Sequence, residues 1–301
     1  MIHFYKILNA LILTLLLSAC QQQSIVMVDA IHVSGKHFSG DALVIRFPDG
    51  TTHLIDTGLG RFTRSDLIPF LKSEKIKRID SILVTHAHTN HYEGLLEIAK
   101  VVEVGEIYFN LPNKTACDRQ TWAGACDYPH VLKAHKAIQD LNIPLKSIDG
   151  NHVLYTQDDI EFKTIFYLGA EAKTPKGWSI NDESVVAKLI VGKHSMLFTG
   201  DLNIKAGNYM LEKKIDLNAD IVLLPHHGVT GTVPNAFIEN THAKYAIVSN
   251  TENHWLGKRG DQLRNLMSKL SIPTYITGID GNIHIELSAE SINITTQNPR
   301  P

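Results

Sequence analysis

The chain lacks an excess of positive charge, a long apolar run beyond its first residues, and any repeat or low-complexity linker. Its 301 residues hold 29 Lys and Arg against 31 Asp and Glu, a formal net charge of −2. Proteins that bind nucleic acid through its phosphates usually show the opposite balance, so the net charge does not support a nucleic-acid partner. No apolar run after residue 24 is long enough to span a membrane. Residues 25–301 are therefore expected to form one domain.

The first residues have the pattern of an export signal. One positive charge lies within the first six residues, and the apolar stretch that follows, up to Leu17, is too short to cross a bilayer. Small residues then precede Cys20, as they do in bacterial lipoprotein signals. We expect residues 1–19 to be a cleaved signal peptide, Cys20 to be lipidated and residues 20–24 to form a polar tether. An ordinary secretory signal is the alternative.

Lipidation at Cys20 would anchor the protein to a membrane without spanning it. No aspartate follows this cysteine directly, which favours the periplasmic face of the outer membrane if the envelope is Gram-negative. Cys117 and Cys126 then remain in an exported chain, where disulfides persist. A bridge between them would add about 2–3 kcal/mol in the chain-entropy model. The alternative is that both cysteines bind a metal.

Short apolar runs alternate with helix-like segments and turn signals along most of the chain. The predicted strands are 25–28, 42–47, 53–55, 81–84, 106–109, 160–166, 185–191, 196–198, 221–224, 245–248, 274–276 and 283–286. The predicted helices are 65–73, 93–101, 129–141, 206–213, 234–240 and 261–270. Each half of the chain supplies both strands and helices, which predicts an α/β fold of two face-to-face sheets with helices outside.

Three imidazoles lie within six residues directly after a predicted buried strand. His86 and His88 alternate, so they point the same way in an extended loop, and His91 approaches from the next turn of the chain. Neutral imidazole is the commonest metal ligand near neutral pH. This cluster therefore predicts a bound metal.

Three further motifs follow predicted strands. Asp56-Thr57-Gly58 offers a carboxylate that can accept the second ring N–H of a ligand histidine. Asp201 follows a buried strand and a glycine, and its two oxygens can bridge two cations. His226 and His227 come directly after another apolar strand. Any one of these motifs alone is more often an ordinary polar strand end, but all of them in this order indicate a metal site.

This order of motifs resembles the metallo-β-lactamase superfamily. Within it, residues 40–50, 181–186, 197–202 and 219–228 resemble the hydrolase domain of the bacterial competence DNA-uptake channel, ComEC. The likeness extends over about 28–287 but includes no membrane helices. It implies a four-layer αβ/βα sandwich with the site at one edge.

The resemblance also implies a ligand set. His86 and His88 would bind the first metal, and His91 would bind the second. Asp201 would bridge the two ions. Either histidine of the 226–227 pair would complete the second site, and the glycine that follows favours His227 slightly. His226 would then contact a negatively charged substrate oxygen.

Two positions depart from the family pattern. Asn90 stands where members usually have an aspartate, and an amide is a weaker ligand that cannot act as a general base. The second metal site should therefore be weaker. Asn181 stands where many members place a histidine, although the ComEC-like group also has asparagine there. Asp56 and Asn181 are thus expected to support the ligands from behind.

The chemistry implied is hydrolysis with one or two Zn²⁺ ions, or Mn²⁺, because such a cation lowers the pKa of a coordinated water and polarises the bond to be cut. The leading prediction is an exported hydrolase acting on a phosphodiester or related ester, with Asp201, His226 and Asn90 at the reacting centre. One alternative is a β-lactam or lactone hydrolase. The other is a degenerate metal-binding or ligand-binding protein with little catalysis, which Asn90 favours.

Overall fold

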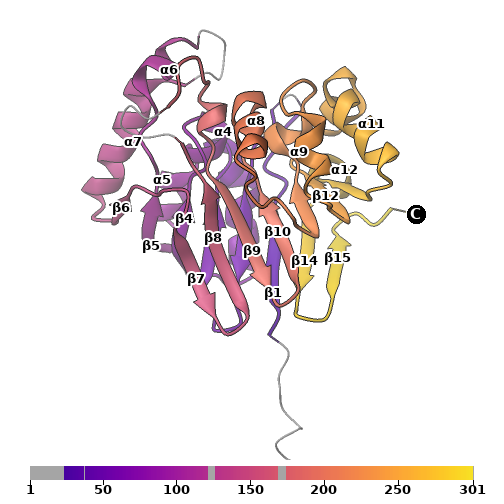
Figure 1. The fold of residues 1–301 in the computed structure, drawn as a ribbon. Helices are drawn as coiled ribbons and strands as arrows, with labels where there is room; N and C mark the ends of the chain where they lie inside the picture. Colours follow the sequence, from indigo (N-terminus) through magenta and orange to yellow (C-terminus); the bar gives the residue numbers. More distant parts are fainter. Residues whose placement is uncertain (1–23, 37, 121–125, 169–173, 301) are drawn as a thin grey trace, which may run out of the picture.

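A computed structural model describes residues 24–36, 38–120, 126–168 and 174–300. The predictions for the signal peptide and for Cys20 lie outside these residues. Within them, two sheets lie face to face with helices on both outer sides (Figure 1). The predicted α/β class and its two-sheet architecture are confirmed. No helix of the described residues is long and apolar enough to cross a membrane.

The first sheet has eight strands in the order β15-β14-β1-β2-β3-β4-β5-β6. Their bounds are β1 Val26–Ala30, β2 Leu43–Arg46, β3 Thr52–Ile55, β4 Arg78–Leu83, β5 Glu103–Tyr108, β6 Leu145–Lys146, β14 Ile283–Leu287 and β15 Ile292–Thr296. The second sheet has seven strands in the order β13-β12-β11-β10-β9-β8-β7. Their bounds are β7 Val153–Gln157, β8 Ile160–Phe166, β9 Val186–Val191, β10 His194–Phe198, β11 Ile221–Leu223, β12 Tyr245–Val248 and β13 Thr274–Ile276.

Short helices join these strands. The α-helices are α2 Gly60–Phe62, α3 Ile68–Ser73, α4 Thr89–Tyr92, α5 Leu95–Ala99, α6 Lys114–Asp118, α7 Tyr128–Asp140, α8 Ile204–Glu212, α9 Asn235–Glu239, α10 Glu252–Leu256, α11 Asp261–Lys269 and α12 Thr277–Asp280. A π-helical turn, η1 Thr63–Leu67, links α2 to α3. Three 3₁₀ turns are η2 Asn181–Glu183, η3 Pro225–Gly228 and η4 Lys258–Gly260.

Three apolar clusters account for the layers. The central cluster lies between the sheets and takes side chains from both, for example Ile45 and Phe162. A second cluster covers the outer face of the first sheet beneath α3, α5 and α7, and a third covers the second sheet beneath α8, α9 and α11. A sheet face or a helix stripe that is apolar must be covered, so four layers result. Each cluster contributes through the burial of apolar surface.

The sequence missed three strands and several short helices. β6, β7 and β15 have no fully buried residue along their length. Partial burial leaves only a short and weak apolar pattern in the sequence, as at β15, where Ile292 and Ile294 alternate with polar residues. By contrast β8 alternates strictly between buried and half-exposed residues, and its bounds were predicted correctly.

Parallel pairing determines where the functional loops meet. β3, β4 and β5 run parallel in the first sheet, as do β10, β11, β12 and β13 in the second. The carboxyl ends of parallel neighbours lie at the same edge of a sheet, where ligands of open α/β sheets usually bind. The loops that leave β3, β4, β10 and β11 therefore share one edge of the sandwich.

His53 on β3 makes stability sensitive to acid. Its ring is buried against Phe47 and Phe162, Nδ1 lies 2.6 Å from Ser81 Oγ, and burial lowers its pKa to about 4. As pH falls from 6.5 towards 4, this histidine is protonated only in the unfolded chain, so the free energy of unfolding falls, by about 3 kcal/mol in total.

We expect His53→Gln to remove this part of the acid destabilisation. Urea unfolding of both proteins between pH 4.5 and 7.5 measures the free energy of unfolding. The difference in this free energy between the two proteins should be smaller at low pH than at pH 7.5. His135, whose pKa is likewise lowered to about 4 by burial, keeps part of the slope in both proteins. An identical pH dependence in the two proteins would contradict the role given to His53.

Candidate metal centre

The candidate site is built from loops at the carboxyl ends of four strands. Asp56 follows β3, residues 85–91 follow β4, Asp201 follows β10, and His226 and His227 follow β11. The buried polar side chains among them meet in one cluster. The structure thus brings together all of the residues that the sequence placed around the metals.

Asp201 lies between two groups of histidines. Its Oδ1 is 3.3 Å from His91 Nε2 and 3.4 Å from His227 Nε2. Its Oδ2 is 3.7 Å from His86 Nε2 and 3.8 Å from His226 Nε2. Each oxygen therefore faces its own set of imidazoles, which is the arrangement that a bridging carboxylate requires.

Three groups of ligand atoms among the described residues are close enough to hold a cation: two share Asp201, and the third is Asp41, Asp56 and His91. His86, His88 and Asp201 form one set, and His91, Asp201 and His227 form the other, with the atoms of each set within 4.8 Å of one another. His91 Nε2 and Asp201 Oδ1 are buried and have no hydrogen-bond partner among the described residues. A divalent cation would satisfy both atoms, and nitrogen and oxygen ligands of this kind suit Zn²⁺. The residues therefore fit a metal centre.

Asp56 holds His91 in the orientation that a ligand needs. Its carboxylate lies 2.7 Å from His91 Nδ1 and accepts hydrogen bonds from the backbone N–H and the hydroxyl of Thr85, both at 2.8 Å. His91 then carries its proton at Nδ1 and presents Nε2 to Asp201. Asp56 was predicted to support a ligand histidine, and the structure places it behind His91.

The electrostatics differ between the two sets. Burial and the neighbouring His91 lower the pKa of His86 well below its ordinary value, and burial lowers that of His88 to about 4, so both are neutral near pH 7. At His91, burial would lower the pKa, but Asp201 and Asp56 raise it well above the ordinary value. The negative charge of Asp201 and Asp56 that favours a proton on His91 also favours a metal cation at the same place. A bound cation would replace that proton.

At Asp201 the neighbouring charges lower the pKa of the side chain. Burial alone would raise its pKa, but His227, His91 and His226 hold it well below the usual range. This carboxylate is therefore ionised and faces both ligand sets with its negative charge. Because it is only 2% exposed, water screens that charge little.

The two histidines after β11 are presented by a strained turn. His226 and His227 both have left-handed backbones, with φ of 51° and 55°. Non-glycine residues adopt this conformation at a cost of about 1–2 kcal/mol each, and such strain gathers at functional sites. Gly228 follows with φ of 73°, and a Cβ there would lie 2.8 Å from the Trp255 ring. Glycine is therefore required after the pair.

His227 joins the second ligand set, while His226 faces the solvent side. His227 is 6% exposed at its side chain, compared with 25% for His226. Two asparagines hold the His226 ring: Nδ1 donates to Asn203 Oδ1 at 3.1 Å, and Nε2 accepts from Asn181 Nδ2 at 3.3 Å. Asn181 thus supports His226, and not one of the residues in the two ligand sets.

Asn90 makes two contacts in the second set. Its Nδ2 donates to the carbonyl of Ser39 at 3.1 Å and lies 3.1 Å from His227 Nε2. The side chain lies beside His227, at the sequence position where the resemblance predicts an aspartate. It brings no charge, so the second set has one carboxylate, Asp201, where the family pattern supplies two.

Two contributing residues were not assigned a role from the sequence. Asp41 is 2% exposed, and its Oδ1 lies 3.5 Å from His227 Nδ1. It lies behind His227 as Asp56 lies behind His91, but its oxygen is farther away and makes no hydrogen bond to the ring. The residue was visible within the ComEC-like stretch 40–50 but precedes its strand, unlike the other site residues. The second missed residue is Gln120, whose Oε1 lies 2.8 Å from His88 Nε2.

Residues 35–119 match the model of the metallo-beta-lactamase superfamily. Over 217 residues the chain is 26% identical to ComE operon protein 3 of Bacillus subtilis (strain 168), covering 72% of this chain and 26% of that protein. It is 22% identical over 218 residues to Competence protein ComA of Neisseria gonorrhoeae, covering 70% and 26%. Over residues 35–119 the chain is similar to the metallo-beta-lactamase superfamily. It resembles ComEC, and it spans about a quarter of the length of both curated relatives.

A solved structure agrees with this superfamily fold. The CmlA beta-hydroxylase E377D mutant superposes with a TM-score of 0.51 at 16% identity, covering 89% of this chain and 54% of that chain. At such identity the likeness concerns the fold alone. The predicted four-layer metallo-β-lactamase sandwich is thereby confirmed.

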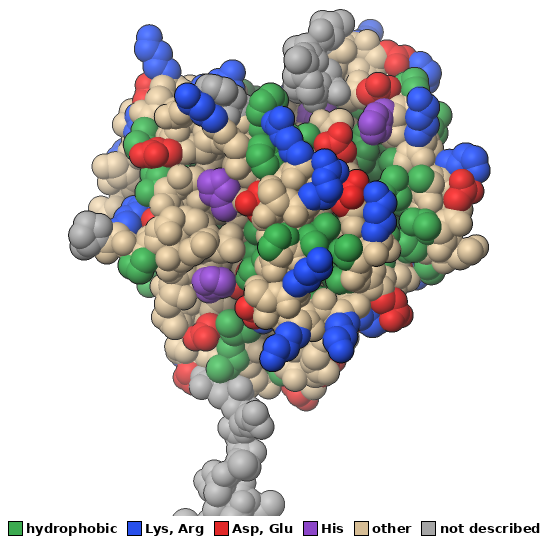
Figure 2. All heavy atoms as spheres, turned by 180° about the vertical axis from the view of Figure 1, so that it is seen from behind, with side chains coloured by type: hydrophobic (Ala, Val, Ile, Leu, Met, Phe, Trp, Pro, Cys, Tyr) green, Lys and Arg blue, Asp and Glu red, His purple; other side chains and the backbone are tan. Residues whose placement is uncertain are grey.

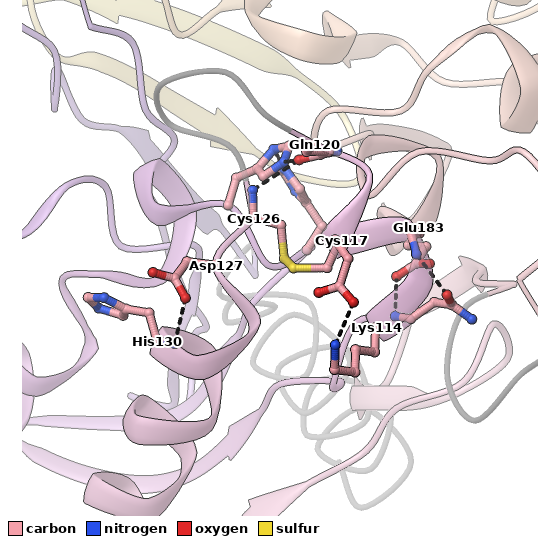
Figure 3. The surroundings of a disulfide bond; sticks show 12 residues. Lys114, Cys117, Gln120, Cys126, Asp127, His130 and Glu183 are labelled. Atoms are coloured by element: carbon pink, nitrogen blue, oxygen red, sulfur yellow. Dashed lines mark hydrogen bonds and ion pairs between the residues drawn. A yellow bond between two sulfur atoms is a disulfide. The ribbon is translucent and has the colours of Figure 1, made fainter.

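The structure also contains the predicted disulfide. Cys117 at the end of α6 is bonded to Cys126 just before α7 (Figure 3). Both cysteines are buried. The alternative, in which the two cysteines bind a metal, does not apply to this bonded pair.

Proposed function

We propose that this protein is an exported metal-dependent hydrolase that acts on a phosphodiester or a related ester. The observation that carries the proposal is a shared carboxylate: Asp201 belongs to both ligand sets, and the sets lie beside a pocket that contains arginines. Two cations held by one carboxylate can stabilise the attacking and leaving oxygens of a displacement at phosphorus. The resemblance to ComEC supports the same substrate class.

The pocket has a volume of about 650 Å³ and joins the metal centre to the surface. His226, His227 and Asn90 form its inner end. Its walls include three cationic side chains, Arg61 and Arg64 from the α2–η1 segment and Arg259 from η4. The same walls include Glu93 and Glu97, and Glu97 is paired with Arg64, so the case for a negatively charged substrate depends on Arg61 and Arg259.

Two of these arginines are available to bind an anion. Arg64 pairs with Glu97 at 3.1 Å, whereas Arg61 and Arg259 have no carboxylate within 4.0 Å among the described residues. The Arg61 guanidinium lies over Phe38, 4.5 Å from the ring centroid, which holds it at the wall of the pocket. Figure 2 shows several Lys and Arg side chains on one face of the molecule, with Asp and Glu side chains among them. A formal net charge of −2 is therefore compatible with two arginines at this pocket that pair with no carboxylate of the described residues.

Each side chain has a defined task. When bound, the cations supply Lewis-acid polarisation of the ester and a nucleophile derived from water at neutral pH. Asp56 orients His91, and Asp41 lies behind His227. His226, held by its asparagines at the inner end of the pocket, is placed to contact an oxygen on which negative charge develops. Asn90 cannot take up a proton, so it is excluded as a general base.

An activity screen tests the proposal. The purified full chain, loaded with Zn²⁺ or with Mn²⁺, is offered bis(p-nitrophenyl) phosphate, single-stranded DNA, a chromogenic cephalosporin and a lactone. We expect turnover of the phosphodiesters that disappears on chelation and returns on adding metal. Turnover of the lactam or lactone alone would replace the proposed substrate class. No metal-dependent turnover on any of the four would favour a binding protein.

Arg61→Ala should weaken the binding of a phosphodiester more than it slows its conversion. Loss of one charged hydrogen bond at an open pocket corresponds to about a tenfold increase in KM, with kcat nearly unchanged. Steady-state kinetics on bis(p-nitrophenyl) phosphate measure both quantities. Lys133→Ala, which removes an exposed cation from α7 outside the pocket, is the control and should change neither. An unaltered KM in Arg61→Ala would argue against an anionic substrate group at this wall.

A further inference from the structure

Gln120 connects the candidate metal ligand His88 to the disulfide. Its Oε1 lies 2.8 Å from His88 Nε2, and the same oxygen accepts a hydrogen bond from the backbone N–H of Cys126 at 3.0 Å. Figure 3 shows Gln120 beside the bond between Cys117 and Cys126. No role in the family motifs accounts for this side chain.

The two contacts together identify the atom that faces His88. At this site the amide oxygen and nitrogen of a glutamine are distinguished by their partners. A backbone N–H can only donate, so the atom that Cys126 contacts is the carbonyl oxygen. His88 must then donate to that oxygen from Nε2. Its proton is therefore on Nε2, and Nδ1 keeps the lone pair.

That tautomer is the one required of a ligand. His88 Nδ1 lies 3.0 Å from His86 Nε2, on the side of the ring that faces the first ligand set. A metal-binding histidine usually donates its other ring N–H to an acceptor that fixes its tautomer and its orientation. Asp56 supplies such an acceptor for His91, and Gln120 occupies the corresponding place for His88.

The disulfide in turn fixes Gln120. The backbone N–H of Gln120 donates to the Cys117 carbonyl at 3.0 Å, and its side chain accepts from Cys126. Asn113 caps α6 through its side chain, which accepts from the Ala116 N–H, and so anchors the end of the segment that carries Cys117. Gln120 is therefore hydrogen-bonded to both of the bonded cysteines, through its backbone N–H and through its side chain.

We propose that Gln120 is a positioning residue for the metal ligand His88, and that the Cys117–Cys126 disulfide keeps it in place. The first cation should therefore bind more tightly when the disulfide is intact. This inference rests on the metal-binding part of the proposed function and is independent of which ester is hydrolysed. It gives the disulfide a task at the metal centre beyond closing its loop.

The test measures cation binding to the full chain. Gln120→Met has similar volume but no acceptor for the His88 N–H, whereas Gln120→Glu keeps an oxygen for both donors. We expect Gln120→Met to weaken binding of the first Zn²⁺ about 10- to 100-fold, the usual loss for an outer partner of a ligand, and Gln120→Glu to bind within about threefold of wild type. The absorption spectrum of the Co²⁺-loaded protein should change in the Met variant and be restored in the Glu variant. Gln139→Met, on an exposed part of α7, is the matched control.

A double-mutant cycle tests the part assigned to the disulfide. Cys117→Ala/Cys126→Ala should weaken the first Zn²⁺, and adding Gln120→Met should weaken it little further, because both changes act through one contact. Thermal unfolding of each metal-free variant separates lost binding from lost folding. If the double cysteine variant does not fold, the comparison of the Met and Glu variants decides alone.

Three results would overturn the inference. The first is a Gln120→Met variant with the affinity and Co²⁺ spectrum of wild type. The second is full additivity of the cysteine and glutamine changes. The third is a wild-type protein that binds no cation, which also overturns the metal centre itself. A wild-type protein that binds cations but hydrolyses none of the screened esters would remove the proposed function and leave this inference standing.

Discussion

Asp201→Ala is expected to release both cations at once. The side chain faces the His86 set with Oδ2 and the His91 set with Oδ1, so its removal takes one ligand from each. It also removes the charge that holds protons or cations at His91 and His227. Loss of an outer partner costs about 10- to 100-fold in metal affinity, and loss of this shared ligand should exceed that at both positions.

Metal analysis after dialysis and Zn²⁺ titration measure this loss, and phosphodiester turnover should fall to the level of the metal-free protein. Glu290→Ala, which removes an exposed carboxylate paired with Lys193, should retain wild-type stoichiometry. Thermal unfolding of the metal-free proteins shows whether the Asp201 variant is folded. Retention of both ions in a folded Asp201→Ala protein would exclude the carboxylate as the bridge.

Asn90→Asp is expected to produce the largest gain. The new carboxylate would lie beside His227 Nε2, at the position now taken by an amide 3.1 Å away. A unit charge about 4 Å from a cation is worth about 4 kcal/mol at an effective dielectric constant near 20, before the cost of burying it. Part of this is offset by the lost hydrogen bond to the Ser39 carbonyl. We therefore expect the second cation to bind about 10- to 100-fold more tightly.

Stoichiometry and affinity for Zn²⁺ and Mn²⁺ are measured in parallel for the two proteins. Asn218→Asp adds the same charge at an exposed position and should change neither quantity. Activity distinguishes the two proposals for wild type: a hydrolase gains turnover from the second ion, whereas a degenerate binder gains occupancy alone. Equal stoichiometry and affinity in wild type and Asn90→Asp would show that the asparagine does not weaken the second site.

Local sequence patterns predicted most of the fold because burial leaves a local trace. β8 and β9 were predicted closely since their alternating or continuous apolar residues reflect the faces that they bury. β7 and β15 left a weaker pattern, because their residues are half-buried or exposed. Helix α10 was not predicted for a related reason: it is five residues long, and Trp255 is its only buried residue. The architecture followed even so, since the buried strands are those that define the two layers.

The candidate site was predictable to the extent that its residues follow strands. His86 and His88 stand in the loop after β4, His91 stands in the short helix α4 that follows, and Asp201 comes soon after β10, so their chemistry and place could be inferred together. Asp41 and Gln120 could not be found in this way. Asp41 precedes β2, and Gln120 lies in the disulfide segment 32 residues after His88. Neither position is special until the surrounding loops are folded together.

The sequence by itself determined which groups are present: imidazoles and carboxylates after buried strands, an amide at position 90, and two cysteines nine residues apart. Those features depend on residue identity and on local burial, both of which can be inferred from the order of residues in the sequence. Only the tertiary structure decided how the groups are shared. It placed His227, 137 residues after Asn90, beside His91 and Asp201, and it left His226 at the pocket. It also placed carboxylates and an amide behind three of the imidazoles. The physical reason is that hydrogen bonds and charge act over a few ångströms, and distances of that size between remote residues are set by the packing of the two sheets.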